Sequence, residues 1–357
     1  MSNLPPSGEI PRGAIRFNTD SNKPELWDGS QWAEFQLSTP NLGRSVDTQP
    51  GARGLFAGGY QPGAYQNDID YINISSKGDT QDFGNLNNAP TAGGGVASRT
   101  RGLFAGGYIG TGPNALAQID YVTIASTGNA QDFGDMALNH FRKGTSGNAT
   151  RGLFAGGGNP GVTDPQIDYV TIASTGNALD YGDLTQMRSR FAGAGSPTRS
   201  VFAGGFSGPS PAVVYEDVID YVTTASIGNA QDFGNLIKGK SWTAVCSNPT
   251  RLLIGGGTAD GNTAVSEMEY ITISTTGNAV MFGDLNKVVD TGAYAGSGLA
   301  SSTRGVFNAG LFKNPGTTYV NTLYYVEIST TGKAIDFGDL DGKRYGVQTC
   351  SNGNGGL

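Results

Sequence analysis

Acidic residues that recur at one position of a repeated block are the first candidates for chemistry in this sequence. They are Asp70, Asp120, Asp168, Asp220 and Glu269, and Tyr324 takes the sixth position. Converging carboxylates bind metal ions or act as general acids and bases. A substrate is asymmetric, however, and needs a few unlike residues at one place, whereas a residue found in nearly every repeat usually serves the repeat. We therefore expect these acids to be structural, paired with repeated arginines or with backbone N–H groups at strand ends.

The other reactive side chains give no catalytic or metal-binding cluster. A DFG triplet at 132–134 mimics the magnesium motif of kinases, but it recurs through the repeats without a catalytic loop or a lysine strand. His140, Cys246 and Cys350 are too few for a closed zinc site of four ligands. The glycine pairs lack the following helix that a phosphate-binding loop requires. We expect no metal, no cofactor and no enzymatic activity.

These residues belong to a sixfold internal repeat. The motif RGLFAGG and its variants RSVFAGG, RLLIGGG and RGVFNAG begin at Arg53, Arg101, Arg151, Arg199, Arg251 and Arg304. The steps between these arginines are 48, 50, 48, 52 and 53 residues. Each copy is followed by a second block such as IDYVTIASTGNAQDFGDM, which starts at Ile119. A period of this length indicates stacked supersecondary units.

One unit contains the pattern of four short strands. Residues 101–107 form an apolar run that ends in two glycines, and residues 119–125 carry β-branched or aromatic side chains on both faces. The STGN tetrad at 126–129 predicts a hairpin turn into a third strand at 130–133. The fourth strand is expected in the small-residue segment at 144–150. Because no stretch has a helical period, the sequence predicts an all-β fold.

Composition limits the partners. The formal net charge is −7, from 23 basic and 30 acidic residues, which gives no footprint for binding nucleic acid. No apolar run is long enough to insert into a membrane, and the N-terminus lacks the pattern of a secretion signal. The 57 glycines have no strict triplet spacing, which excludes collagen. We expect a folded protein that is made in a cytoplasm.

The repeat resembles kelch repeats, which form β-propeller blades. An arginine with small residues, an apolar strand ending in Gly-Gly, an acid–aromatic strand and a short strand with an aromatic follow in that order, although Phe replaces the usual Trp in QDFG at 131–134. The resemblance implies a six-bladed kelch-like propeller over residues 41–357, preceded by a small N-terminal β-meander. The segment at 342–352 is the expected closing strand of the first blade, and a segment starting at Arg44 competes for that place.

Residues 1–40 lie outside the repeat. Turn-forming residues at 20–23 and 28–30 separate short aromatic-bearing segments, which predicts a three-stranded meander. A meander of this size buries too little to offset its ordering entropy, so its aromatic side chains should pack on another surface. The docking candidates are Phe17, Trp27, Trp32 and Phe35.

The same segment resembles a module of bacteriophage tail-fibre and virion proteins. The matching residues are Gly13, Ile15, Arg16, Phe17, Asn18, Thr19, Asp20, Asn22, Glu25, Trp27, Asp28, Gly29 and Trp32. The propeller blocks are similar to those of kelch-like structural proteins of marine phages, cyanophages above all. Together these resemblances imply a virion structural protein, such as a tail fibre, appendage or decoration, assembled in the host cytoplasm. Its partners would be other virion proteins within a symmetric multimer.

The loop that follows each Gly-Gly pair varies in length and is rich in Gly and Pro. Its aromatic residues are Tyr60, Tyr65, Tyr108, Phe206, Tyr215, Phe312 and Tyr319. Either they form a contact surface for a protein or a host-surface glycan, or they cover the edges of the blades. A glycan-binding receptor-recognition lectin is the alternative function. A polysaccharide-degrading enzyme is third, because no asymmetric cluster of carboxylates can be nominated.

Overall fold

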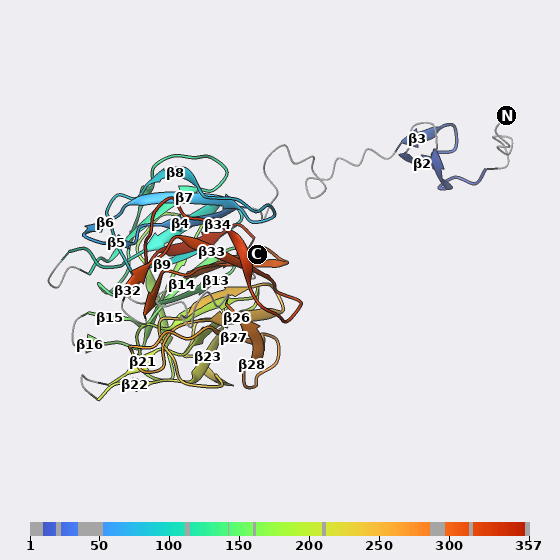
Figure 1. Cartoon of the computed structure of the whole chain (residues 1–357). Coiled ribbons are helices and arrows are strands. Elements are labelled where there is room, and N and C mark those ends of the chain that lie inside the picture. Colours follow the sequence, from blue (N-terminus) through green and yellow to red (C-terminus); the bar gives the residue numbers. More distant parts are fainter. Residues whose placement is uncertain are drawn as a thin grey trace. The chain divides into compact units, whose positions relative to one another are not determined.

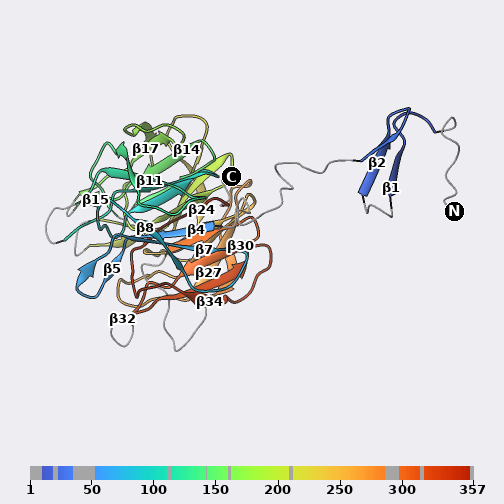
Figure 2. The same cartoon turned by 90° about the horizontal axis from the view of Figure 1, so that it is seen from above.

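The chain forms two compact units, Met1–Asp47 and Thr48–Leu357, which are described separately (Figures 1 and 2). The computed structural model describes residues 10–18, 23–34, 53–110, 115–141, 143–159, 162–208, 212–285, 297–313 and 317–353. All regular secondary structure in these ranges is β-strand, as the sequence predicts. Within them, no helix is long and apolar enough to cross a membrane.

The first unit contains a three-stranded antiparallel sheet in the order β1–β2–β3. Its strands are β1 Ile15–Asn18, β2 Lys23–Trp27 and β3 Trp32–Glu34. The β2–β3 turn is fixed by Asp28, whose Oδ1 accepts hydrogen bonds from the backbone N–H groups of Ser30 and Gln31 at 2.7 and 2.8 Å. Gly29 supplies the positive φ of 103° that this turn requires. The predicted meander is therefore present.

The described residues of the second unit form six four-stranded antiparallel sheets, named here sheets 1 to 6. Sheet 1 contains β35 Gln348–Ser351, β4 Arg53–Ala57, β7 Asp68–Asn73 and β8 Gln81–Asn85. Sheet 2 contains β9 Gly94–Ala97, β10 Arg101–Ala105, β11 Gln118–Thr123 and β12 Gln131–Asp135. Sheet 3 contains β13 Gly144–Gly147, β14 Arg151–Ala155, β17 Gln166–Thr171 and β18 Leu179–Asp183.

The remaining three sheets follow the same order. Sheet 4 contains β19 Ala192–Gly195, β20 Arg199–Ala203, β23 Val218–Thr223 and β24 Gln231–Asn235. Sheet 5 contains β25 Ala244–Ser247, β26 Arg251–Gly255, β27 Glu267–Thr272 and β28 Val280–Asp284. Sheet 6 contains β29 Ser297–Ala300, β30 Arg304–Asn308, β33 Thr322–Glu327 and β34 Ile335–Asp339.

Short two-stranded ribbons extend four of the loops that follow the second strand of a sheet. They are β5 Tyr60–Gln61 with β6 Ala64–Tyr65, β15 Gly158–Asn159 with β16 Val162–Thr163, β21 Phe206–Ser207 with β22 Val214–Tyr215, and β31 Leu311–Lys313 with β32 Thr317–Tyr319. A glycine pair follows the second strand in sheets 1 to 5, where sheet 6 has Ala309 and Gly310, and it explains why that strand stops. Gly106 and Gly107, for example, have φ of 65° and 105°, which side chains with a Cβ rarely adopt.

Hydrogen bonds between neighbouring sheets link the six sheets in cyclic order. Gly128 N, in the outer hairpin of sheet 2, donates to Phe83 O of sheet 1 at 2.7 Å. Gly78 N of sheet 1 donates in the same way to Phe337 O of sheet 6 at 3.0 Å. Accordingly, blue β4 and β7 lie beside orange β30 and β34 in Figure 2. The C-terminal strand β35 completes sheet 1 and pairs with β4 through Gln348↔Ala57.

The core lies between adjacent sheets, where large side chains face small ones. One buried cluster joins Leu55 and Phe83 of sheet 1 to Val122 of sheet 2. A Cβ placed on Gly102, in the second strand of sheet 2, would lie only 2.9 Å from Cys350 Sγ of sheet 1. The glycine of the RG motif therefore leaves room for a neighbouring side chain, which explains part of the high glycine content.

Candidate functional site

The recurrent acids lie buried beside a second set of cations. Asp220 Oδ2 is 2.9 Å from Arg188 Nη1, and both side chains are fully buried. Glu269 Oε1 is 2.7 Å from Lys240 Nζ. In sheet 1 the carboxylate of Asp70 pairs with Arg344. These cations precede the first strand of their own sheet, so the expected pairing of the acids with the repeated arginines is wrong.

In the other three sheets this position does not form such an ion pair among the described residues. Asp120 of sheet 2 accepts bonds from Asn87 N and Asn87 Nδ2 at 3.0 and 2.7 Å. Asp168 of sheet 3 accepts a hydrogen bond from Ala137 N at 3.2 Å. Sheet 6 has Tyr324 at the position of the acid. Backbone N–H groups thus donate hydrogen bonds to these two acids, which is the second of the two pairings expected from the sequence. Burial raises the pKa of both Asp120 and Asp168.

The repeated arginines lie at the opposite end of the second strand and join neighbouring sheets. Each guanidinium packs over a tyrosine of its own sheet; Arg101 Cζ, for example, is 4.4 Å from the centre of the Tyr121 ring. Each also donates to a backbone carbonyl of the next sheet: Arg53 to Ile124, Arg101 to Ile172, Arg151 to Ala225, Arg199 to Ile273, Arg251 to Ser329 and Arg304 to Ile74.

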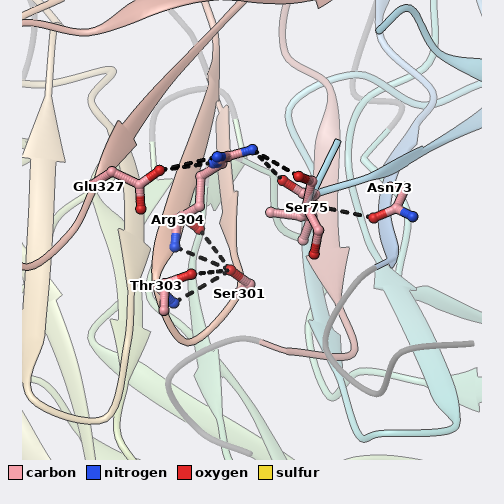
Figure 3. A network of polar contacts seen from close by, with 7 residues as sticks. Asn73, Ser75, Ser301, Thr303, Arg304 and Glu327 are labelled. Carbon is pink, nitrogen blue, oxygen red and sulfur yellow. Dashed lines mark hydrogen bonds and ion pairs between the residues drawn. The ribbon is translucent and has the colours of Figure 1, made fainter. Parts of the chain in front are cut away.

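Figure 3 shows the contact that joins sheet 6 to sheet 1. Arg304 Nη1 donates to the carbonyls of Ile74 and Ser75 at 3.1 and 3.2 Å, and its Nε donates to Glu327 at 3.1 Å. Ser301 Oγ accepts from the backbone N–H of Arg304 at 3.0 Å and fixes the turn before the arginine. At the arginine end of the second strands, the contact between an arginine and a backbone carbonyl of the next sheet thus occurs six times.

Four of the five predicted loop tyrosines, all except Tyr215, belong to a continuous row of aromatic rings. The row runs from Tyr319 through Tyr345, Tyr60, Tyr65 and Tyr108 to Phe141, with ring centroids of consecutive members 5.0 to 6.1 Å apart. It crosses from sheet 6 to the loops of sheets 1, 2 and 3. Phe141 is buried, whereas the tyrosines are half-buried. The rings therefore pack on one another over the loops of these sheets, and the tyrosines also expose part of their ring surface.

Tyr345 and Phe141 are members of this row that the sequence analysis missed. Both lie in the segment that enters the first strand of a sheet, outside the variable loops. Isolated bridges Tyr60↔Tyr345 and Phe141↔Gly158 pair those segments with the loops. Both residues are aromatic and occupy equivalent positions in their repeats. This pattern could have identified them as members of the row, but only if the register of the bridge were known.

A second aromatic group lies on sheets 4 and 5. Arg190 Cζ is 4.4 Å from the ring centre of Phe206 and 4.8 Å from that of Trp242. Phe206 pairs with Tyr215 across its ribbon. The loop of sheet 4 also approaches sheet 5, because a Cβ on Gly261 would lie 2.5 Å from Tyr215 Oη. Arg190 and Trp242 were also missed by the sequence analysis.

Two predicted site residues fall outside what the structure describes. Phe35 lies beyond the described residues of the first unit. The backbone of Phe312 pairs with Thr318, but its side chain lies outside the described atoms.

In the N-terminal sheet, Trp27 is packed against Trp32, whereas Phe17 is exposed. Trp27 is 5% exposed, and its ring centroid lies 5.5 Å from that of Trp32. Arg16 stacks over Trp32 with its Cζ 4.2 Å from the ring centre, and its Nε donates to Glu25 at 2.7 Å. Phe17 is 59% exposed. Trp27 thus serves the packing of the sheet, Trp32 is half-buried, and Phe17 is the most exposed of the docking candidates that the structure describes.

The first strands of the six sheets line a central cavity of about 160 Å³ in the second unit. Small residues such as Gly95, Gly193 and Gly298 form much of its wall. A Cβ on Gly95 would lie 2.4 Å from Thr349 O, so these strands approach too closely for larger side chains. At the loop end the wall includes Arg190 and Trp242.

The two cysteines are free and buried, as is usual for thiols that pack in a core. Burial raises the pKa of both thiols far above the ordinary range. Among the described residues, no three His, Cys, Asp or Glu side chains converge in a way that could hold a metal ion.

A scan against protein-family models and a search of the curated proteins each return no match for this sequence.

Proposed function

We propose that the second unit is a six-bladed, kelch-like β-propeller and that each of the six sheets is one blade. Two sets of contacts support this proposal: the arginine contacts and the outer-hairpin hydrogen bonds, both of which continue from sheet 6 to sheet 1. The first strands of successive sheets also contact one another around the central cavity. This is the arrangement expected of blades around an axis.

The function we propose is that of a non-enzymatic virion structural protein, such as a tail fibre, appendage or decoration. The observation that carries it is the pairing of a fibre-type N-terminal motif with a repeat whose acids are engaged in structural contacts. Asp220 and Glu269 are held by buried cations, and Asp120 is held by amide groups. Carboxylates bound in this way serve the fold rather than a substrate.

In this proposal the N-terminal unit docks on other virion proteins, and the propeller forms part of a symmetric multimer. Phe17 and Ile15 are 59% and 67% exposed on the N-terminal sheet, which gives a small apolar surface for a partner. The loop end of the propeller makes protein or host-surface contacts through its aromatic row. A glycan-binding lectin is the second candidate, and half-buried tyrosines at adjacent positions favour it, because sugar rings stack on aromatic faces.

Removal of residues 1–40 tests the docking role. The shortened chain should keep the far-ultraviolet circular dichroism and the melting temperature of the second unit, yet fail to enter particles when supplied during assembly. A full-length Phe17→Ala chain should enter particles less well, while Asp341→Asn, an exposed change outside the N-terminal unit, should enter normally. Normal incorporation of the shortened chain would rule out docking through the N-terminal unit.

A further inference from the structure

Equivalent residues at the mouth of the central cavity share an unusual backbone conformation. Ala92, Arg190, Trp242 and Gly346 each follow the residue that forms the isolated bridge to the loop of the same sheet, and their φ values are 57°, 58°, 59° and 65°. Glycine adopts this left-handed region readily, whereas other residues are strained in it. Strained side chains persist where the surroundings or the function require them.

The two large strained side chains lie together. Trp242 N donates to Arg190 O at 2.8 Å, as Ala92 N does to Gly346 O at 2.7 Å. The Arg190 guanidinium carbon is 4.8 Å from the Trp242 ring centre and 4.4 Å from that of Phe206. Both Arg190 and Trp242 are half-buried and border the cavity. The backbone geometry at this position is satisfied by Ala or Gly in other sheets, so it does not require an arginine or a tryptophan.

The charge at the cavity is opposite to that of the chain. Arg190 and Lys143 are the charged residues among the described lining, and the buried Lys143 directs its Nζ to Met136 Sδ, 3.1 Å away, so Arg190 is the cation that borders the mouth. The whole sequence has a formal net charge of −7. An arginine at the mouth of a cavity whose described lining holds no acidic residue favours an anionic ligand.

The wall also contains hydroxyl groups that are not engaged. Ser146 Oγ and Thr243 Oγ1 are buried and have no hydrogen-bond partner among the described residues. Both residues line the cavity. Thr243 directly follows Trp242 in the chain, and a buried hydroxyl without a partner gains from a hydrogen bond to a ligand.

We propose that the mouth of the cavity at Arg190 and Trp242 binds a carboxylated sugar residue of a surface polysaccharide. The indole of Trp242 stacks on the C–H face of the sugar ring, and the guanidinium of Arg190 binds its carboxylate. A hydroxyl group of the sugar bonds Thr243, the residue that follows Trp242. This inference rests on the host-surface contact proposed above, and names the chemistry of the ligand and the sheets that bind it.

Titration of the full chain with sodium glucuronate, followed by amide chemical shifts or calorimetry, tests this site. Glucuronate should bind at least about tenfold more tightly than glucose, because glucose lacks the charge-assisted contact to Arg190. Acetate supplies the carboxylate without the sugar ring and should bind at least about tenfold more weakly than glucuronate. Absence of glucuronate binding up to about 50 mM, or equal binding of acetate, would overturn the proposal.

Glycine substitutions separate the role of the side chains from that of the backbone. Arg190→Gly and Trp242→Gly suit the positive φ, so the backbone keeps its conformation while glucuronate affinity should fall at least about tenfold. Ala92→Gly makes the same backbone change in sheet 2 and should leave the affinity unchanged. Unchanged affinity in Trp242→Gly would contradict the assigned site. Particle incorporation through residues 1–40 is measured separately, so failure of glucuronate binding and failure of the virion role give different results.

Discussion

The two ends of the repeated second strand differ in how uniform they are. At the arginine end, all six sheets use an arginine that packs on a tyrosine and donates to the next sheet. At the loop end the sheets diverge. Asp220 pairs with Arg188, Asp120 binds Asn87, and Tyr324 replaces the acid in sheet 6.

The difference shows where the chain can change without loss of the contacts between sheets. A contact that joins one sheet to the next recurs at each of the six interfaces. A contact within one sheet needs only to fill its own buried space. The loop end is consequently free to acquire unlike side chains, and it carries both the aromatic row on sheets 6, 1, 2 and 3 and the Arg190–Trp242 pair on sheets 4 and 5.

The largest expected effect comes from breaking the buried ion pair of sheet 4. Asp220→Asn removes the carboxylate that pairs with the guanidinium of Arg188 at a site where both side chains are fully buried. We expect a loss of about 3–5 kcal/mol in the free energy of unfolding. Denaturant unfolding followed by circular dichroism measures it.

The equivalent change in sheet 2 is the matched control. Asp120 is bound by the amide of Asn87 and the backbone, so Asp120→Asn uncovers no buried cation and should cost only about 1 kcal/mol. Equal losses for the two variants would show that the loop-end contacts of sheets 2 and 4 do not differ in energy.

Much of the fold could be predicted because the repeat displays the same pattern six times. The all-β class, the glycine-terminated second strand and the N-terminal meander all follow from local patterns. Strand limits shifted slightly: the expected strand at 130–133 is β12 Gln131–Asp135. Turn and strand preferences are local, and a pattern seen repeatedly averages out the exceptions.

The partners of the acids could not be predicted, because they depend on register. Arg188 and Lys240 lie about thirty residues before the acids they bind, in segments that vary between repeats, and only the packing brings them together. Leu252 is a similar case. It stands where four other repeats have glycine and one has Ser200, and the small side chain of Ala194 in the preceding sheet packs in the same buried cluster. Sequence spacing alone does not specify such complementary pairs.

A smaller effect is expected at Lys143, which lies near Asp168 in sheet 3. Burial lowers the pKa of Lys143 to about 8, although Asp168 and Asp164 act to raise it. The folded state therefore binds fewer protons than the unfolded state between about pH 8 and 10.5, so this group makes stability rise with pH in that window. Below pH 8 its burial cost is fully present.

Replacement by methionine should remove this pH dependence. Lys143→Met keeps most of the side-chain volume, and we expect it to stabilise the protein at pH 7 by about 2–3 kcal/mol. The gain over the wild type should shrink as pH rises from 8 to 10.5, which unfolding curves at several pH values measure. A constant difference between the two chains would contradict the assigned cause.

The smallest difference is expected between two interfaces of the arginine end, which should lose equal stability. Arg101→Ala removes the contact with Tyr121 and the 2.9 Å hydrogen bond to Ile172 O, and we expect a loss of about 2 kcal/mol. Arg199→Ala removes the corresponding contacts with Tyr221 and Ile273 O, also 2.9 Å long. Because the two sites have the same geometry, the losses measured by denaturant unfolding should agree within about 0.5 kcal/mol. A larger gap would mean that the uniform contacts at this end do not contribute uniform stability, and the contrast between the two ends would then be one of geometry alone.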